Sequence, residues 1–546
     1  MKKLVWLVVA VGLYLLVNVS GLFVPMIVNA AKYAQVGREI LDNRDWINLT
    51  VGGEAYDQKP PLLFWIAAVT FKLFGISGIA YKLVILLFSL IGVYATFKLG
   101  ELLYDKRTGS LAAFFWATCL GYVHFHNDIH TDTLLVVPVM LSIWQYAAYF
   151  KKKKEYHFYL GTVFVGLAML DKGPVGMVIP GAAVGLHLLL TRNFKAIVNY
   201  RWLVAIPMVA LLISPAIWGL YKQFGTEGIK FYFWTNNMGR ITGSYHGSDN
   251  DPFFYLHTTL YMIAPWAVFG FAGLFMQIRE KVKRKLNFTG EDEFFTLGGI
   301  LVYLLIASVA KQQNPHYEMA VLPLILILGA RWAFLIFETP AFSRLKKAIG
   351  YIHLVVACLL FLLIVPFIIY FFQESRLWIW TVVVVLAGAF VYILSWKNSL
   401  NKQLSYLLVS GSALLFILNT SILPNMGKYH SSFEAVRTFN ENTSGKEELH
   451  IYTEEGRYWE IFFYSKNYGR YLITPKDYME DPPAVNDWLY TGQEGLEELE
   501  EMNVKVDTVK VLSHRSLSRM SLKFLNPKTR KLKLETRYLL RVRGAR

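Results

Sequence analysis

The chain has 546 residues with a formal net charge of +16, and 55% of them are hydrophobic. The apolar residues gather in blocks close to the length of about 20 residues that a helix needs to cross a bilayer, which excludes a soluble globular fold. The basic residues lie mostly beside these blocks, where membrane orientation and anionic lipid explain them better than a nucleic-acid partner does.

The first apolar block, 4–27, lacks a small-residue cleavage site, so we expect an uncleaved first span. A polar stretch from Val28 to Trp65 follows, called the roof segment below, and loops of this length are usually functional. KYAQVGREI predicts a short amphipathic helix with Tyr33, Val36 and Ile40 on one face. We interpret this segment as the roof of an active site at the membrane surface.

The short apolar stretch 62–75 predicts a helix lying at the interface. About 13 membrane spans of bilayer length are predicted. They lie at 4–27, 80–103, 110–125, 131–150, 157–171, 174–191, 202–221, 256–278, 293–311, 317–337, 348–373, 376–396 and 403–423. Basic clusters then fall in alternate loops, which the positive-inside rule places in the cytoplasm with the N-terminus. The opposite, outer side of the membrane is expected to carry the first outer loop, 28–79, a second large loop, 222–255, and the C-terminal region.

The predicted fold class is a polytopic all-α membrane domain over 1–424, followed by a small α/β extramembrane domain over 425–546. In the second part, alternating runs at 448–453, 470–475, 506–512 and 532–542 predict strands, with a helix between the first two. The chain contains neither a GxGxxG nor a P-loop pattern between a strand and a helix, so a nucleotide cofactor is not expected.

Polar residues concentrate in the outer loops. If HFHNDIHTD (124–132) continued as a helix, Asp128 and Asp132 would lie one turn apart on one face. Other outer loops carry Lys59, Lys172, Asn236, Arg240, His246, Asp249, Lys311, His316 and Tyr317. Ionisable residues at membrane depth are costly and usually functional. The alternative is that they are ordinary interfacial anchors.

Cations suit a phosphate group, a carboxylate suits deprotonation of a hydroxyl, and aromatic faces suit a sugar ring. This combination predicts glycosyl transfer from a polyprenyl-phosphate sugar lipid to a glycolipid, glycan or protein acceptor, with membrane lipids as further partners and no nucleic acid. Two rivals stay open: a non-catalytic protein that binds lipid-linked glycans, and a transporter or flippase for polyprenyl-linked sugars. A transporter predicts charges near mid-membrane and internal repeats, and neither is clear in this sequence.

Several motifs resemble the C-type glycosyltransferases of the protein O-mannosyltransferase and aminoarabinose-transferase (ArnT-like) family. The likeness covers roughly residues 1–340 and consists of KYAQVGREIL, YDQKPPLLFW, HTDTLLVVPVML, GLAMLDKGPVGMVIP, NNMGR with DPFFY, and AKQQNPHYEMAVLP. The resemblance implies an inverting enzyme of the bacterial inner membrane. It would act at the periplasmic face on an undecaprenyl-phosphate sugar, with lipid A, a glycan or a protein as acceptor.

The resemblance also implies roles for individual residues. Asp132 is the first candidate for general base, with a helix N-cap as the alternative. Asn29 stands where relatives have an acid, so Asp57 is the candidate replacement base. Lys59 and Arg240 are expected to bind the donor phosphate, and their alternative is headgroup anchoring. Further phosphate candidates are Lys172 and Lys311, and the substrate-binding candidates are Tyr33, Tyr56, Asn236, His316 and Tyr317.

A divalent metal ion is a further hypothesis. Gln58 and Asp249, with His246 nearby, stand where relatives carry residues that resemble metal ligands. Separately, His126 and His130 are spaced i, i+4 and would bind a metal together with Asp128 or Asp132 if one helix carried them. The alternative for this second pair is hydrogen-bonded interfacial histidines.

Overall fold

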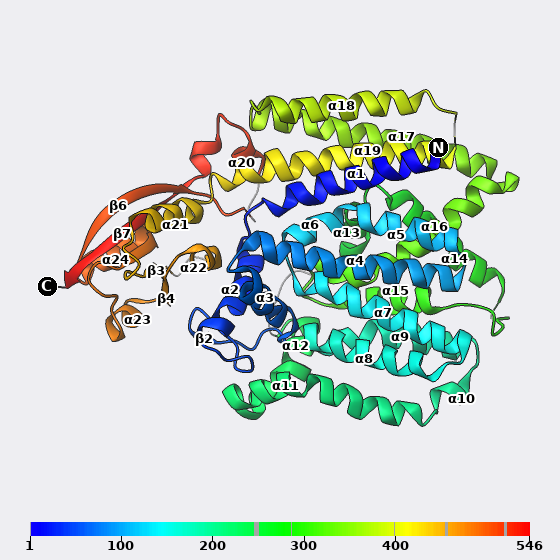
Figure 1. The fold of residues 1–546 in the computed structure, drawn as a ribbon, viewed down its shortest axis with the longest axis horizontal. Helices are drawn as coiled ribbons and strands as arrows, with labels where there is room; N and C mark the ends of the chain where they lie inside the picture. Colours follow the sequence, from blue (N-terminus) through cyan, green and yellow to red (C-terminus); the bar gives the residue numbers. More distant parts are fainter. Residues whose placement is uncertain are drawn as a thin grey trace.

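The computed structural model describes residues 2–244, 251–285, 287–397, 399–453, 457–517 and 521–545. A helical bundle makes up most of the molecule, and a small α/β domain projects from the end opposite the N-terminus (Figure 1). This arrangement confirms the predicted fold class.

The bundle is built from helices that follow one another with short connections. They are α1 (Lys2–Leu22), α4 (Gly78–Leu103), α5 (Lys106–Thr118), α6 (Leu120–Asn127), α7 (Thr131–Lys152), α8 (Glu155–Lys172), α9 (Val175–Leu190), α10 (Phe194–Ile197), α11 (Arg201–Lys230), η1 (Phe231–Thr235), α12 (Asn236–Thr242), α13 (Phe254–Met262), α14 (Ala267–Lys283), α15 (Phe295–Val309), η2 (Pro315–Ala320), α16 (Leu322–Glu338), η3 (Pro340–Phe342), α17 (Ser343–Val365), η4 (Pro366–Phe371), α18 (Leu377–Leu394), α19 (Leu400–Ile417), η5 (Leu418–Ile422) and α20 (Leu423–Gly427).

Within the described residues, six helical stretches are long and apolar enough to cross a membrane, and several shorter apolar helices accompany them. The six are Gly78–Leu103, Thr131–Lys152, Phe194–Thr242, Pro340–Phe371, Leu377–Leu394 and Leu400–Gly427. The chain is therefore a multi-pass membrane protein. The predicted total of about 13 spans of bilayer length stays a prediction.

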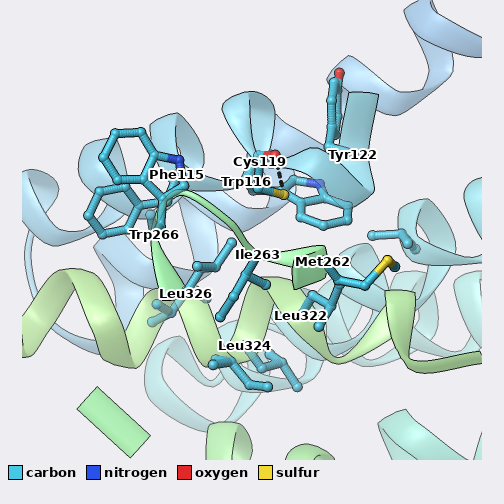
Figure 2. Packing of buried hydrophobic residues seen from close by; sticks show 14 of the residues in the cluster. Phe115, Trp116, Cys119, Tyr122, Met262, Ile263, Trp266, Leu322, Leu324 and Leu326 are labelled. Carbon is cyan, nitrogen blue, oxygen red and sulfur yellow. Dashed lines mark hydrogen bonds between the residues drawn. The ribbon is translucent and has the colours of Figure 1, made fainter. Parts of the chain in front are cut away.

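Two predicted spans, 110–125 and 256–278, are each divided into two helices. Cys119 adopts an extended conformation between α5 and α6, and the backbone N–H of Leu120 donates to the carbonyl of Ala264, between α13 and α14, at 2.8 Å. Figure 2 shows buried side chains from both breaks, with Phe115 against Trp266 at a ring distance of 4.7 Å. A backbone N–H or carbonyl that loses its helical hydrogen bond inside a membrane protein needs another partner. The two breaks therefore supply each other with a hydrogen-bonding partner.

The roof segment contains α2 (Val28–Asp42) and a hairpin of β1 (Thr50–Val51) and β2 (Glu54–Ala55), and it leads into α3 (Leu62–Phe74). Gly52 and Gly53 form the hairpin turn with φ of 65° and 80°, which glycine adopts without strain. The buried carboxylate of Glu39 accepts hydrogen bonds from the N–H of Gly52 at 2.6 Å and from the hydroxyl of Thr50 at 2.7 Å. The hairpin is thereby fixed to α2.

The C-terminal domain consists of α21 (Ser431–Asn442), β3 (Leu449–Tyr452), α22 (Trp459–Tyr464), β4 (Tyr468–Leu472), α23 (Pro475–Glu480), β5 (Trp488–Gly492), α24 (Gln493–Glu501), β6 (Val504–His514), α25 (Leu522–Leu525), η6 (Arg530–Lys533) and β7 (Glu535–Ala545). Its five-stranded sheet has the order β4-β3-β5-β7-β6, in which β3 is parallel to both neighbours and β7 is antiparallel to both of its own. The four strands expected from the sequence are present. We did not predict β5, because it is buried on both faces and shows no alternation.

The C-terminal domain docks on α2. The guanidinium of Arg38 donates to the carbonyls of Phe462, Ser465 and Lys466 at 2.9 to 3.0 Å. The hydroxyl of Tyr468 donates to the carboxylate of Asp42 at 2.8 Å. Both faces of α2 are therefore covered, and not only the face that the sequence predicted to be buried.

Candidate active site

The site lies where the roof segment meets the ends of α7, α8, α12 and η2. Lys59 stands in the roof loop directly before Pro60 and Pro61, and Lys172 is the last residue of α8. Gly173 follows with φ of 77°, a conformation that glycine favours, and Pro174 then starts the turn into α9. The DKGP motif thus stops α8 at a point that directs Lys172 toward the start of α7.

Asp132 forms the centre of the cluster. Its side chain is only 3% exposed and forms an ion pair with the ammonium of Lys172. The Nε2 atom of His316 lies 3.9 Å from a carboxylate oxygen of Asp132, and the ammonium of Lys172 also lies 4.6 Å from the ring centre of Tyr317. Asp132 is therefore a buried anion with cationic and polar neighbours, within reach of an acceptor group bound at this point.

Arg240 is held by polar groups from three segments. Its guanidinium donates to Asn236 at 2.8 Å, to Gln312 at 2.9 Å and to the hydroxyl of Tyr317 at 2.7 Å. The amide of Asn236 donates in turn to the carbonyl of Gln58 at 3.2 Å, beside Lys59. These three partners are neutral polar groups, and they orient the guanidinium.

Lys59 faces other cations. Burial lowers the pKa of its ammonium to about 7, and the charges of Arg240 and Lys172 contribute to this shift, whereas Asp132 opposes it. Lys59 is half-buried, and a charged lysine partly removed from water beside other cations is unfavourable unless an anion joins it. The arrangement of Lys59, Arg240 and Lys172 therefore favours an anionic ligand, such as a phosphate, among them.

Aromatic side chains of the roof segment close the cluster. Tyr33 is 5% exposed, and its ring lies 5.6 Å from Phe64 and 6.4 Å from His130. The ring of Tyr56 also lies 5.6 Å from that of Phe64. Both tyrosines predicted to bind substrate therefore come from the roof and pack above the ends of the membrane helices.

Lys32 is a further basic residue of the site that was not among the predicted phosphate-binding residues. Its ammonium donates to the side-chain oxygen of Gln58 at 2.9 Å and lies 4.8 Å from the centre of the Tyr56 ring. It also lies 5.7 Å from the ring of Trp459 in the C-terminal domain. Burial lowers its pKa to about 8. The sequence feature that could have identified Lys32 as a site residue is its position directly before Tyr33 in the KYA motif.

The helix expected to carry HFHNDIHTD is interrupted, which corrects two expectations. Asp128 ends α6 and His130 caps α7, so Asp128 and Asp132 do not lie one turn apart on one helix. Asp128 instead pairs with His130 at 3.2 Å, and the ring of His130 lies 4.2 Å from that of His316. His126 bonds back to the carbonyl of Tyr122. His126 and His130 therefore do not lie on one helix, and metal binding by this pair stays a prediction.

The remaining predicted residues lie around this cluster. Asn29 is half-buried in the first turn of α2. Asp57 lies near Lys32, and burial raises its pKa. Lys311 is exposed, with its backbone N–H donating to the carbonyl of Ile241 at 3.3 Å. His246 and Asp249 lie outside the described residues.

A metal ion would need several His, Cys, Asp or Glu side chains close together. Among the described ranges, no three His, Cys, Asp or Glu side chains are grouped so that they could hold a metal ion. The metal hypothesis for Gln58, His246 and Asp249 stays a prediction, because His246 and Asp249 lie outside the described residues.

The sequence matches known proteins over part of its length. Residues 58–218 match the family described as dolichyl-phosphate-mannose-protein mannosyltransferase. An uncharacterized protein of Aquifex aeolicus is 26% identical over 309 residues, which is 55% of this chain and 58% of that one. An undecaprenyl phosphate-alpha-4-amino-4-deoxy-L-arabinose arabinosyl transferase of Yersinia pestis is 25% identical over 311 residues, 55% and 54% of the two chains. The chain spans a little over half the length of the curated relatives it matches.

The fold has known counterparts over nearly the whole chain. The crystal structure of ArnT from Cupriavidus metallidurans bound to undecaprenyl phosphate superposes with a TM-score of 0.74, at 14% identity and over 98% of both chains. The archaeal oligosaccharyltransferase AglB from Archaeoglobus fulgidus superposes with a TM-score of 0.51, at 12% identity, over 92% of this chain and 70% of that one. With the sequence matches, these likenesses confirm the resemblance that the motifs predict.

Proposed function

We propose that this chain, an ArnT-like C-type glycosyltransferase by sequence and fold, is an inverting enzyme that transfers a sugar from a polyprenyl-phosphate donor. The proposed donor is an undecaprenyl-phosphate sugar, and the acceptor is lipid A, a glycan or a protein. The reaction takes place at the periplasmic face of the bacterial inner membrane. The N-terminus is cytoplasmic and the C-terminal domain periplasmic.

One observation carries the proposal. Lys172 pairs with the buried carboxylate of Asp132 and lies 4.6 Å from the ring centre of Tyr317, whose hydroxyl accepts from Arg240 at 2.7 Å. Asn236, which accepts from Arg240, also donates to the carbonyl of Gln58, the residue before Lys59. Three cations from three segments of the chain are thus linked beside Asp132. A lipid-linked phosphate enters such a site from the bilayer, with its sugar under the tyrosines of the roof segment. A donor of this kind carries its own leaving group and needs no nucleotide.

The reaction follows from the charges. An oxygen of the acceptor attacks the anomeric carbon on the side opposite the phosphate, so the configuration at that carbon inverts. The bond between the anomeric carbon and the phosphate oxygen breaks, and the singly charged phosphodiester leaves as a doubly charged phosphate monoester. Lys59 and Arg240 stabilise the additional negative charge, which grows toward the transition state, and thereby lower the barrier.

The proton of the acceptor group goes to the carboxylate of Asp132. This carboxylate is paired with Lys172, which weakens it as a base. A donor phosphate competes for the same ammonium, so donor binding would loosen the pair and make Asp132 available. Asp57 is the second candidate base, and the amide of Asn29 could orient the acceptor because it cannot accept the proton itself.

The test is mass spectrometry of envelope glycolipids and glycans from wild-type cells and from cells carrying Asp132→Asn at equal protein abundance. Loss of one sugar from a defined acceptor in the variant would support transfer and identify both substrates. An unchanged profile in cells that lack the whole protein would favour the non-catalytic binder. Movement of lipid-linked sugar across vesicles without transfer would favour the flippase. Reporter fusions to the two termini test the orientation.

A further inference from the structure

The segment between β6 and β7 is basic and carries exposed apolar side chains. Residues 521–534 contain five lysines and arginines and no acidic residue. Leu522 is 77% exposed and Leu532 is 80% exposed, while Lys523, Lys528, Lys531 and Lys533 are all exposed. Exposed leucines among lysines are unfavourable in water and favourable at a membrane surface, where the leucines enter the headgroup region and the ammonium groups meet phosphates.

This segment is fixed to the outer end of a membrane span. Arg530 donates to the carbonyl of Phe371, the last residue of η4, and the hydroxyl of Tyr370 donates to Asn526 at 3.0 Å. Figure 1 shows the segment in red, close to the ends of α18 and α20. Since η4 continues the apolar stretch Pro340–Phe371, a segment attached to its end lies at the level of the membrane surface.

The exposed leucines are not needed for the internal packing of the domain. Phe524 and Leu525 of α25 are buried, and the ring of Phe524 lies 5.5 Å from that of Tyr429. The helix thus directs one pair of side chains inward and leaves Leu522 and Lys523 on the outside. Near this level, Trp378 at the start of α18 is 52% exposed, as expected for an aromatic residue in the headgroup region.

A polar hollow adjoins the segment. It has a volume of about 220 Å³ and lies between the end of η4 and α20, with Arg376 and Lys428 on its walls. Glu374 also lines it, but its carboxylate is only 3% exposed and pairs with Arg376 at 2.6 Å. The ring of Phe372, another wall residue, lies 5.3 Å from the guanidinium carbon of Arg530. The hollow therefore keeps a net positive charge and is continuous with the basic segment.

We infer that residues 522–533, together with the hollow beside them, form a membrane-surface site that binds the phosphate-bearing headgroups of anionic lipids. The interaction holds the C-terminal domain against the bilayer, independently of the sugar-transfer site. Each lysine close to an anionic surface strengthens such an association roughly fivefold, so three lysines account for roughly a hundredfold.

The experiment places a fluorescent probe on a cysteine at position 532 of the full-length protein in nanodiscs (Leu532→Cys, with Cys358→Ser to prevent labelling there). The nanodiscs contain either phosphatidylcholine alone or one third phosphatidylglycerol, and some lipids carry bromine to quench the probe. We expect lipid quenching with phosphatidylglycerol, much less without it, and a loss of the difference in high salt. Hydrogen exchange of 521–534 in the same nanodiscs reports the contact without a probe.

Charge variants complete the test. Replacing Lys528, Lys531 and Lys533 by glutamine should reduce quenching in phosphatidylglycerol to the phosphatidylcholine value. Replacing three exposed lysines elsewhere on the domain, Lys446, Lys476 and Lys505, should leave it unchanged. The inference is overturned if the probe stays in water in both lipids, if both triple variants behave alike, or if quenching does not depend on lipid charge.

Discussion

Binding of the donor should depend on pH through Lys59. The pKa of Lys59 is lowered to about 7, first by partial burial of the ammonium and then by the charges of Arg240 and Lys172. An anionic phosphate favours the charged lysine and raises this pKa again, so binding takes up a proton. Affinity is therefore highest below pH 7 and falls as the pH rises through 7.

The magnitude follows from the fraction of protein that already carries the proton. With a pKa of about 7 this fraction falls from about 0.9 at pH 6 to about 0.1 at pH 8, which predicts an increase of about tenfold in the dissociation constant. The phosphodiester of the donor keeps a single negative charge over this range, so it does not contribute. Lys32, with a pKa of about 8, adds at most about twofold to the increase in the dissociation constant, because about half of this lysine is still charged at pH 8.

The assay is donor binding to the purified protein in detergent or nanodiscs at pH 6, 7 and 8, with a donor that cannot be hydrolysed. Lys59→Arg keeps the charge at every pH and should remove most of the dependence, because a guanidinium does not lose its proton in this range. Lys59→Gln should bind weakly at all three values. A wild-type dissociation constant that changes less than twofold, or a tenfold change that persists in Lys59→Arg, would refute the argument.

Three further predictions concern other parts of the site. Asp132→Asn should lower kcat by about 10² to 10⁴, as expected for a lost general base, and should strengthen donor binding, because it frees the Lys172 ammonium for the phosphate; an unchanged kcat would exclude this role. Arg240→Gln should lower kcat by about 10² to 10³ in the same transfer assay, and Arg240→Lys by less; a change in KM alone would contradict stabilisation of the leaving group. Arg38→Ala removes hydrogen bonds from a charged donor, each contributing about 1.5 to 3 kcal/mol, so the unfolding temperature should fall and hydrogen exchange over 459–472 should accelerate. Unaltered exchange there would show that Arg38 does not hold the domain.

Much of the bundle could be predicted because apolar length and the placement of basic loops act locally. The breaks at Cys119 and near Ala264 could not, since each depends on a hydrogen-bonding partner about 145 residues away in the chain. The break between Asp128 and His130 was missed in the same way. The i, i+4 spacing assumed a continuous helix, whereas His130 caps α7 and turns toward His316, a residue from a distant loop.

The cations of the site were recognisable as costly charges at the ends of apolar blocks. Contacts through Tyr317, Asn236 and Gln58 link Lys172, Arg240 and the loop of Lys59. The sequence did not reveal that Lys172 pairs with Asp132, because nothing local joins positions 40 residues apart. Nor did it reveal that Gln312 and Tyr317 orient Arg240. The contacts of Arg240 depend on the approach of α12 to the segment 312–317, and the pair of Lys172 with Asp132 depends on the packing of α8 against α7. No single segment encodes either.

The docking of Arg38 also bears on how the protein is made. Arg38 emerges early from the ribosome, but its partner Phe462 lies 424 residues later. At typical synthesis rates of about 5 to 20 residues per second, α2 waits about 20 to 85 s for the domain that completes its surroundings. A nascent or truncated chain that has reached the membrane therefore lacks the support of its roof segment. Assembly of the substrate site is thereby tied to completion of the whole polypeptide.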